Sequence, residues 1–515
     1  MGEEKIREGI KISRRNALKA VAGLGTLAAI NGLGMHLAGG TAEAAVIKKL
    51  PNKWDEEYDM VIVGSGFAGL AAAAEAGSRG NKVLIVDKMP ILGGNSIING
   101  GGYCAWTDKL NLRKTLNRGE DSAQLHYEDT LKGGDYYNNP ALVRILVEQA
   151  PEALNWMIDE GNLKLRPMLN RIGGHSAYRG HISIDGTGKP YIEALKKVAD
   201  KGGAKIRLNT KITWIWRKDW DGPVLGVETE TNRRVRNLKV RKAVIIASGG
   251  FSRDVKMRTS LNPSLVAEYN TTNQPGATGE LIRYTQAVGA DTLHLAFIQL
   301  YPTAEPNTGI LDAWALYPSR SPSNGAVFVN REGKRFVSEL ERRDVVSRAE
   351  IKLGKKPAFT IFNQRIVPMM TTPQEIEAGI AKGRVWKADT LAELAKKMDL
   401  PPKTVEETVE KHNRYVAAGK DPDFNKPITK QMGTLAGGPF YGVAQWPAIH
   451  HTMGGLRIDT AARVIDIWGE PIPKLYAAGE VTGGIHGANR LGGNATAECV
   501  VFGRVAGVNA GKEKA

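Results

Sequence analysis

Cysteine is nearly absent from this sequence of 515 residues, since only Cys104 and Cys499 occur. Neither a CxxCH pattern nor a CxxC cluster is present, so the chain offers no c-type haem attachment and no cysteine-ligated iron–sulfur centre. We expect no metal site. Long lysine and arginine runs and basic stripes interleaved with aromatic residues are also missing, which argues against a nucleic-acid partner.

The length of the chain predicts two to three domains, because 515 residues are too many for one hydrophobic core. Hydrophobic residues make up 42% and charged residues 24%, which is ordinary for a globular protein and gives no reason to expect disorder over the bulk. The formal net charge is +16. Such a basic balance fits either an ordinary solvated surface or a docking face for an acidic protein or substrate.

The first 45 residues have the pattern of an export signal. A twin-arginine motif, SRRNALK at 13–19, is followed by a weakly apolar run rich in glycine and alanine and by AEA at 42–44. An uncleaved anchor helix is the alternative, but glycines, Asn31 and His36 make the run a poor membrane span. We therefore expect residues 1–45 to be a twin-arginine signal peptide, a periplasmic protein loaded with its cofactor before export, and no stable membrane span in the mature chain.

A dinucleotide-binding fingerprint follows a polar linker. It comprises a predicted strand at 61–63, the turn residues Gly64, Gly66, Ala68 and Gly69, a helix at 70–79, a second strand at 83–86, and Asp87. The glycines allow a tight turn and close approach of a pyrophosphate, and the helix N-terminus faces its charge. Asp87, 18 positions after Gly69, is placed to accept a hydrogen bond from a ribose hydroxyl.

The continuation of the fingerprint resembles FAD-binding oxidoreductases rather than NAD dehydrogenases. Its loop runs from Lys88 through Asn95 and Ser96 to the glycines at 100–102. Strands predicted at 243–247 and 475–478, the second ending in Gly479 and Glu480, resemble the later FAD contacts of the two-dinucleotide-binding fold, with Glu480 on the adenosine side. We expect an α/β, Rossmann-like FAD-binding domain assembled from both ends of the chain, with an α+β domain inserted between them.

A second binding loop lies near the C-terminus, in the glycine-rich run AGEVTGGIHGANRLGGNA at 478–495. Glycine in such quantity costs backbone entropy unless a ligand must approach the backbone closely. The following residues, 495–507, are small and apolar enough for a buried helix. Gly492, Gly493 and Asn494 then lie at a helix N-terminus, where an anion or a polarised carbonyl is favoured, with the charge of Arg490 nearby.

From about 55 to 510 the chain resembles the flavoprotein of the soluble fumarate reductase (flavocytochrome c) family, which includes urocanate, methacrylate and acrylate reductases. The resemblance rests on the fingerprint, NREGKRF at 330–336, HHTMGG at 450–455 and HGANRLGGNA at 486–495. It implies FAD-binding segments at 55–295 and 452–510. It also implies that 296–451 form a mobile clamp domain that closes over the flavin and the substrate.

The resemblance further implies a reaction and its residues. Flavin N5 gives hydride to the β-carbon of an unsaturated carboxylate while Arg343 protonates the α-carbon. His450 and Arg490 match the family's carboxylate-binding pair, and the bidentate fork of arginine suits a carboxylate. The wider predicted set is Gly493, Tyr301 and Tyr317 for the substrate, and Gly64, Gly66, Ala68, Gly69, Asp87, Lys88, Asn95, Ser96, Gly101, Ala247, Gly279, His451, Glu480, Ala495 and Thr496 for the cofactor.

Two of these assignments have alternatives. Arg343 is an unusual acid, because the pKa of a free guanidinium is above 12, so a proton relay must restore its charge. It is also placed to form a surface ion pair with Asp344 or Glu339, and the neighbouring Arg342 leaves open which arginine acts. His451 fits either a flavin-side support or a packed core histidine.

Departures from the fumarate pattern concern the far end of the site. Where fumarate reductases of the family have a histidine for the second carboxylate, this chain has Tyr301, and their Thr-Glu-x-x-Arg relay segment falls at PSRSP, 318–322. With Trp314, Leu316 and Tyr317 the far end becomes apolar, which disfavours a second carboxylate, unless these aromatics only fill the clamp core. Arg320, Glu305 and Asp312 are candidates to replace the relay.

The sequence thus favours a periplasmic FAD-dependent reductase of a monocarboxylate of the methacrylate or acrylate type. A separate c-type cytochrome must supply the electrons, and the basic mature surface suits an acidic partner. Flavin attachment is expected to be non-covalent, because no histidine occurs between His36 and His126. The alternatives are a fumarate or urocanate reductase, a 3-ketosteroid-type FAD dehydrogenase, and an FAD-carrying electron-transfer subunit without its own substrate.

Overall fold

The computed structural model describes residues 48–430 and 432–515. The predicted twin-arginine signal, 1–45, lies outside the described residues. Within those two ranges, no helix has the length and apolar character needed to cross a membrane.

A largely parallel sheet forms the centre of the first core. Its order is β17-β18-β9-β1-β2-β6, with the antiparallel strands β7 and β8 attached to β9. The bounds are β1 Glu56–Val63, β2 Val83–Val86, β6 Lys205–Arg207, β7 Lys211–Arg217, β8 Val224–Thr231, β9 Arg234–Ile246, β17 Arg463–Ile465 and β18 Pro471–Ala477. In the parallel register, Val61 of β1 is opposite Leu84 of β2 and Val244 of β9. The predicted strands at 61–63, 83–86, 243–247 and 475–478 are confirmed, with C-terminal ends within one residue of the prediction, but β1, β9 and β18 start earlier, at Glu56, Arg234 and Pro471.

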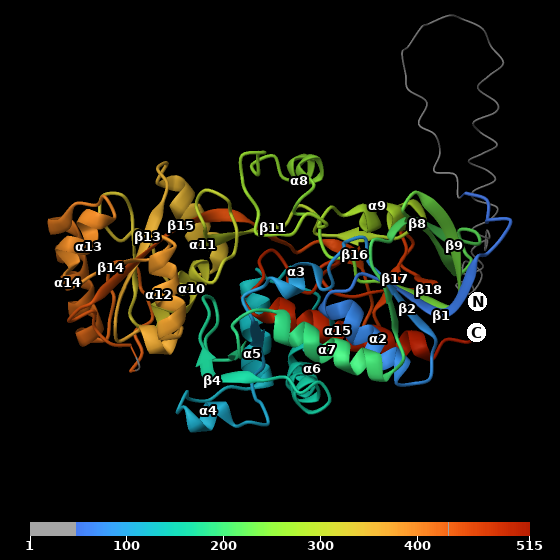
Figure 1. The fold of residues 1–515 in the computed structure, drawn as a ribbon, viewed down its shortest axis with the longest axis horizontal. Helices are drawn as coiled ribbons and strands as arrows, with labels where there is room; N and C mark the ends of the chain where they lie inside the picture. The colour runs from blue at the N-terminus through green and yellow to red at the C-terminus, as the bar shows by residue number, and fades with distance from the viewer. Residues whose placement is uncertain (1–47, 431) are drawn as a thin grey trace, which may run out of the picture. The chain divides into compact units, whose positions relative to one another are not determined.

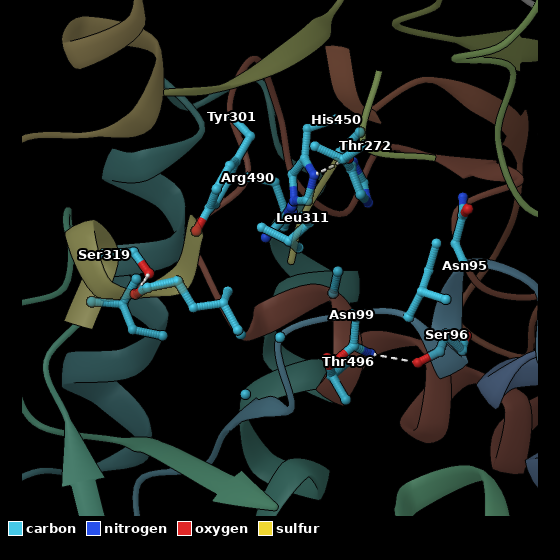
Figure 2. A pocket seen from close by; sticks show the side chains of 18 of the residues that line it. Asn95, Ser96, Asn99, Thr272, Tyr301, Leu311, Ser319, His450, Arg490 and Thr496 are labelled. Atoms are coloured by element: carbon cyan, nitrogen blue, oxygen red, sulfur yellow. Dashed lines mark hydrogen bonds between the residues drawn. The ribbon is translucent and has the colours of Figure 1, made fainter. Parts of the chain in front are cut away.

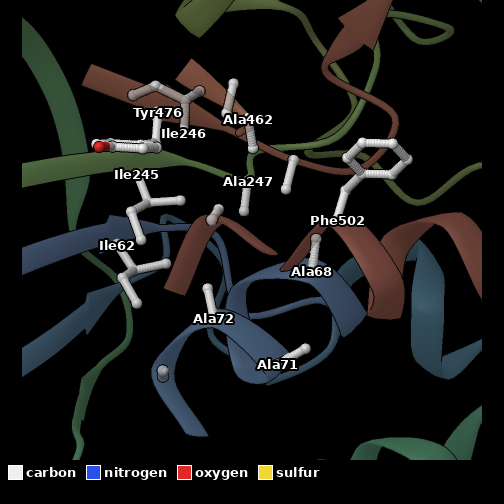
Figure 3. Packing of buried hydrophobic residues seen from close by; sticks show 14 of the residues in the cluster. Ile62, Ala68, Ala71, Ala72, Ile245, Ile246, Ala247, Ala462, Tyr476 and Phe502 are labelled. Carbon is white, nitrogen blue, oxygen red and sulfur yellow. The ribbon is translucent and has the colours of Figure 1, made fainter. Parts of the chain in front are cut away.

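The two ends of the chain meet in this core, as the blue and red ribbons of Figure 1 show. Strand β18, from the C-terminal part, pairs in parallel with β9, and helix α15 (Asn494–Gly511) packs on α2 (Phe67–Gly77). Two glycines of α15 make this approach possible, because a Cβ at Gly503 would lie 2.4 Å from the carbonyl oxygen of Ala68, and one at Gly507 would lie 2.4 Å from that of Ala72. Figure 3 shows the resulting layer of small side chains on α2 beneath Phe502 and the strand residues. The predicted assembly of one core from both chain ends is therefore confirmed.

Further helices and a small sheet surround α2 and α15. Helix α7 (Lys189–Lys201) packs on α2, and α6 (Pro140–Asp159) packs on α15 and on α5 (Ala123–Gly133). The small antiparallel sheet has the order β3-β5-β4, with bounds Gly102–Cys104, Gly180–Ser183 and Leu165–Asn170. Strand β3 of this sheet contacts α15, so the segment 100–102 lies near that helix.

A second sheet, antiparallel, has its own hydrophobic core. Its order is β11-β15-β13-β12, with β14 also paired to β15. The bounds are β11 Ile298–Ala304, β12 Val327–Val329, β13 Ala358–Asn363, β14 Trp386–Ala388 and β15 Phe440–Thr452, and the surrounding helices are α11 Arg343–Lys352, α12 Pro373–Ala381, α13 Leu391–Lys397 and α14 Pro402–Ala418. All of these elements fall within or at the edges of the predicted clamp, 296–451. Contacts run continuously through residues 47–515, so the domain boundaries themselves stay a prediction.

Short elements connect the two cores. Strands β10 (Thr292–Leu293), β16 (Gly455–Arg457) and β19 (Thr482–Gly483) form a small sheet where the chain passes between them. Helices α3 (Gly94–Ile97), α4 (Leu112–Thr115), α8 (Val255–Leu261), α9 (Glu280–Ala287) and α10 (Tyr317–Arg320) complete the described structure.

Candidate functional site

Two cavities that share part of their lining lie where the strands of the parallel sheet end. The first is lined by the β1–α2 turn, the residues after β2, and segments 247–249, 274–281 and 479–480. The second is lined by parts of β11, β15, α10 and α11 and by the loop before α15. Asn95, Ser96, Glu480 and Cys499 line both, so one continuous space runs from the helix α2 N-terminus to the second sheet. Ligands of open α/β sheets bind at this carboxyl-terminal edge.

The β1–α2 turn has the backbone that the fingerprint requires. Gly64 has φ +109°, and a Cβ there would lie 2.2 Å from the carbonyl oxygen of Ala247. Helix α2 starts after Gly66 without a side-chain cap from that residue, and the N–H of Phe67 donates to Ser96 Oγ at 3.1 Å. Ala68 follows and lines the first cavity, so the N-terminus of the helix lies beside that cavity. Gly69 does not line the cavity: a Cβ there would lie 1.9 Å from the oxygen of Gly64, so its lack of a side chain lets helix and strand pack closely.

Asp87 and Lys88 line the first cavity and are already held by the protein. Asp87 Oδ2 accepts hydrogen bonds from the backbone N–H and the hydroxyl of Ser65, at 2.9 and 2.6 Å. Lys88 Nζ donates to Thr278 at 2.6 Å and forms an ion pair with Glu280 at 2.8 Å. The carboxylate therefore fixes the turn while its remaining lone pairs stay available to a ligand hydroxyl.

The second cavity brings together most of the predicted substrate residues. Tyr301 from β11, Arg343 from α11, His450 from β15, and Arg490 and Gly493 from the loop before α15 all line it. Figure 2 shows Tyr301, His450 and Arg490 converging from these separate elements. Ala495 and Thr496 line the same cavity beside Asn95 and Ser96. The geometry thus collects the hydroxyl of Tyr301, the guanidinium groups of Arg343 and Arg490 and the imidazole of His450 around one space.

Arg343 faces this cavity without an ion-pair partner among the described residues. Its guanidinium lies 4.8 Å from the centre of the Tyr301 ring, and Nη1 donates to Gln299 Oε1 at 3.4 Å. A Cβ at Gly492 would lie 3.0 Å from Nη2, so that glycine leaves room for the guanidinium. The side chain is half-buried because it opens onto the cavity, and the protein around its other sides lowers the pKa of Arg343.

Arg342 does not take the place of Arg343 in the cavity, and the neighbouring carboxylates do not pair with Arg343. Arg342 forms ion pairs with Asp135 and Asp344 and does not line the cavity. Glu339 is paired instead with Arg335 at 2.8 Å and with Lys426 at 3.1 Å. The alternative of a surface ion pair for Arg343 with Asp344 or Glu339 is therefore wrong.

Arg490 and His450 form the positively polarised wall of the cavity. Burial, and then the charge of Arg343, hold the pKa of Arg490 well below its usual range, and its buried Nε has no hydrogen-bond partner among the described residues. Burial, Arg343 and Arg490 also hold the pKa of His450 well below 6.5, so the imidazole is neutral. A guanidinium with an unpaired N–H beside a neutral imidazole is an anion-binding arrangement.

His451 faces the junction of the two cavities with both ring nitrogens buried and unpartnered among the described residues. Its ring packs edge to face against His486, with 5.4 Å between the ring centres. Burial lowers the pKa of His451 well below 6.5. Buried polar atoms are rarely left unpaired, so these nitrogens indicate that a polar ligand group completes the site there.

Besides Gly69, two predicted binding residues, Tyr317 and Gly101, line neither cavity. Tyr317 was expected to contact substrate, but its hydroxyl pairs with Thr371 Oγ1 at 2.9 Å and its ring packs on Phe362 in the second core. Leu316, Ser319 and Arg320 line the cavity at helical spacing, and Tyr317 projects from another face of the same turn. Gly101 lies between the lining residues Gly100 and Gly102 with φ +66° and shapes that turn.

The candidate relay residues separate into two groups. Glu305 and Asp312 pair with Arg384, at 3.9 and 2.8 Å, and do not line the cavity. Arg320 does line it, and its Nη2 donates to the carbonyl oxygens of Gly100 and Gly186 at 3.0 and 3.2 Å. Burial, followed by the charge of Arg166, lowers the pKa of Arg320 to about 10. Of the three, only Arg320 is placed near the reacting space.

Several residues of the site gave no signal in the sequence. Gln299 donates to Asn489 Oδ1 at 2.6 Å and to the carbonyl oxygen of Arg490 at 2.7 Å, which ties β11 to the arginine loop. Thr272 pairs with His450 Nδ1 at 2.7 Å, although 178 positions separate them. Only the fold shows that Thr272 lines the cavity and that Gln299 contacts the cavity residue Arg343.

An FAD molecule fits the donor set of this space. The N-terminus of α2 lies at the end where a pyrophosphate is expected, and Ala247 and Gly279 line that end with the glycine turn. The unpartnered nitrogens of His451 and the side chains of Asn95 and Ser96 lie where the cavities meet, beside the predicted substrate residues. Glu480 lies at this junction too, rather than only at the adenosine end.

The comparisons with known proteins agree with this geometry. Residues 59–496 match the family model described as FAD binding domain. A fumarate reductase (cytochrome) of Shewanella frigidimarina is 37% identical over 89% of this chain and 77% of its own length. The acrylate reductase flavoprotein subunit of Shewanella woodyi is 36% identical over 92% of this chain and 96% of its own length. The open conformation of a flavocytochrome c3 fumarate reductase superposes with a TM-score of 0.69 at 34% identity, covering 89% of this chain and 79% of that one.

Proposed function

This chain belongs to the fumarate reductase-like family of FAD-binding flavoproteins, and on that premise we propose that it is a monocarboxylate reductase within that family. Its general activity is FAD-dependent reduction of the C=C bond of an α,β-unsaturated carboxylate. The observation that carries this function is the convergence of Arg343, His450 and Arg490 on the cavity that adjoins the dinucleotide space. FAD, when bound, supplies hydride at N5.

The residues of the chain bind the substrate and supply the proton. Arg490 and His450 hold the carboxylate, on which negative charge builds as the β-carbon receives hydride. Arg343 then protonates the α-carbon, and the surroundings that lower its pKa make its proton easier to release than that of a solvated guanidinium. Tyr301 and Gln299 orient the guanidinium through the ring contact of 4.8 Å and the bond of 3.4 Å.

The favoured substrate is a monocarboxylate of the acrylate or methacrylate type. Leu311, Leu316, Ile172 and Ile182 form an apolar part of the cavity wall, and the Tyr301 ring lies against His450 with 4.9 Å between the ring centres. Arg320, on the same turn as Leu316, also lines the cavity, but its guanidinium donates to the carbonyl oxygens of Gly100 and Gly186. A vinyl or methyl group is stabilised by such a wall, whereas a second carboxylate loses hydration there. Sequence identity to the fumarate reductase and to the acrylate reductase subunit is almost equal, so it does not favour either substrate. The preference for a monocarboxylate is supported by the residues that line the cavity.

The remaining parts of the proposal concern electrons and location. The near absence of cysteine leaves no haem attachment in the chain, so a separate c-type cytochrome is the proposed donor, and the net charge of +16 suits an acidic partner. A periplasmic location follows from the twin-arginine motif. Residues 296–451 are the proposed clamp, and the flavin is proposed to be held without a covalent bond.

The test is re-oxidation of a reduced viologen dye by the FAD-loaded protein, with acrylate, methacrylate, fumarate and urocanate compared as acceptors. Faster turnover of acrylate or methacrylate than of fumarate supports the proposal. Faster turnover of fumarate contradicts the monocarboxylate preference, because the far wall must then hold a second charge. Turnover of none of these acceptors supports the electron-transfer alternative, and oxidation of a 3-ketosteroid with an oxidised dye as acceptor, in a parallel assay, supports the dehydrogenase alternative.

A further inference from the structure

We propose that Thr272 sets the tautomer of His450, so that the ring presents Nε2–H to a carboxylate in the cavity. The inference rests on the proposed function, since a carboxylate is the ligand that this N–H would bind. Thr272 acts on the substrate only through His450 and is a positioning residue. Figure 2 shows the two side chains joined at the cavity wall.

A backbone N–H can only donate a hydrogen bond, so the N–H of Gln274 fixes the orientation of the side-chain amide that it contacts. The N–H of Gln274 donates to Asn95 Oδ1 at 2.8 Å. The amide oxygen of Asn95 therefore points to Gln274, and its NH₂ group is the one that reaches Asn273. There Asn95 Nδ2 donates to Asn273 Oδ1. The orientation of the second amide follows from that of the first.

The side-chain amide of Asn273 is oriented by Asn95 and contacts His450. With Oδ1 facing Asn95, its NH₂ group donates to the backbone carbonyl of His450 at 2.8 Å. A carbonyl oxygen only accepts, so this contact independently requires the same amide orientation. The NH₂ group also lies 3.4 Å from Thr272 Oγ1, where it is again the donor.

The hydroxyl of Thr272 then has one good acceptor for its hydrogen. The carbonyl oxygen of Ile449 is 3.5 Å from Oγ1, whereas His450 Nδ1 is 2.7 Å away. Hydrogen bonds weaken steeply toward the longer distance, so the hydroxyl donates to Nδ1. A nitrogen that accepts a hydrogen bond carries no proton, and in a neutral imidazole the proton is then on Nε2.

The charged groups around His450 keep the ring neutral. Arg343 approaches from α11 and Arg490 from the loop before α15, and the Tyr301 ring covers the ring from β11. Two nearby positive charges and partial burial disfavour an imidazolium. His450 thus binds a carboxylate as a neutral donor beside the guanidinium of Arg490, and its charge stays constant through the reaction.

The experiment uses FAD-loaded wild type, Thr272→Val, Thr272→Ser and a control, Thr229→Val. Thr229 is also buried, lies on β8 outside the lining of both cavities, and its hydroxyl donates to the carbonyl oxygen of Arg236 at 3.1 Å. Binding of propionate is followed by the flavin absorbance spectrum, and KM and kcat are measured with acrylate. Thr272→Val is expected to raise Kd and KM about tenfold, the change that ~1.4 kcal/mol produces, with kcat changed less than about twofold. Thr272→Ser restores both constants and Thr229→Val leaves them unchanged.

A direct reading of the tautomer complements the kinetics. In wild-type protein labelled with ¹⁵N-histidine, the His450 signals, assigned with His450→Gln, are expected to show a protonated Nε2 and an unprotonated Nδ1. A protonated Nδ1 overturns the inference, as does Thr272→Val binding propionate like wild type, or Thr272→Ser binding as weakly as Thr272→Val. A wild-type protein that binds no carboxylate overturns the proposed function, and with it this role of His450.

Discussion

Replacing Arg343 with alanine tests the proposed acid against its neighbour Arg342. In the cavity, the hydroxyl of Tyr301 is directed to the carbonyl oxygen of Ala315 and His450 is neutral, so neither takes over proton donation. Loss of a general acid costs roughly 10²–10⁴ in rate. We therefore expect kcat for acrylate to fall about 10³-fold, which corresponds to ~4 kcal/mol in the activation free energy.

Arg342→Ala is the matched control. Its side chain is 19% exposed and holds ion pairs with Asp135 and Asp344, so its loss removes surface contacts of about 0–1 kcal/mol each and leaves kcat within about twofold of wild type. The assay is viologen re-oxidation by protein of known flavin content, with thermal unfolding measured beside it. The surroundings disfavour the charged form of Arg343, so its removal should not lower the unfolding temperature. If Arg343→Ala keeps more than about a tenth of the wild-type kcat, the reasoning about the acid is refuted.

Three further predictions concern packing, pH and a corrected residue. Gly507→Ala places a Cβ 2.4 Å from the carbonyl oxygen of Ala72, so it should lower the free energy of unfolding by about 1–3 kcal/mol and release FAD. Thermal unfolding measures this change, and an unchanged unfolding midpoint would contradict the close packing of α15 on α2. Burial raises the pKa of Glu498 from 4.5 to about 8, so the native protein binds the extra proton and wild type loses stability as pH rises between those values. Glu498→Gln should flatten that part of the stability profile in denaturant titrations, and identical profiles would argue against it. Tyr317→Phe removes the bond to Thr371 and should cost about 1 kcal/mol of stability without changing KM for acrylate, whereas a raised KM would restore Tyr317 to the substrate site.

The dinucleotide-binding part of the site could be predicted from the sequence because its backbone conformation requires glycine at particular positions. The turn at Gly64 needs a positive φ, and Gly69 must bring helix and strand together, so both positions demand glycine whatever the rest of the chain does. The strands on either side are continuous apolar runs, which is typical of a parallel sheet covered on both faces. Fold class and cofactor were therefore predictable, and helix α2 begins only three residues before the predicted start at 70.

The substrate end depends on contacts between distant segments. Arg343, His450 and Arg490 were found through specific motifs, but Thr272 and Gln299 were not, because their partners lie 178 and 190 positions away in the chain. The interpretation of Tyr317 failed for a different reason. It stands among lining residues in sequence, yet the helical turn directs its ring into the second core, and sequence alone did not give the rotation of that short helix.

The packing of α15 on α2 has a consequence for the order in which the protein is made. The dinucleotide turn at 64–69 is translated early, but its covering helix, Asn494–Gly511, is translated only after the second sheet and its helices. Strand β18, which completes the sheet beside β9, is also translated late. A chain that ends before this helix lacks the surface that covers α2, and one that ends before β18 also lacks the strand beside β9, so we expect both to bind flavin poorly. Stable flavin binding thus depends on segments from both parts of the chain.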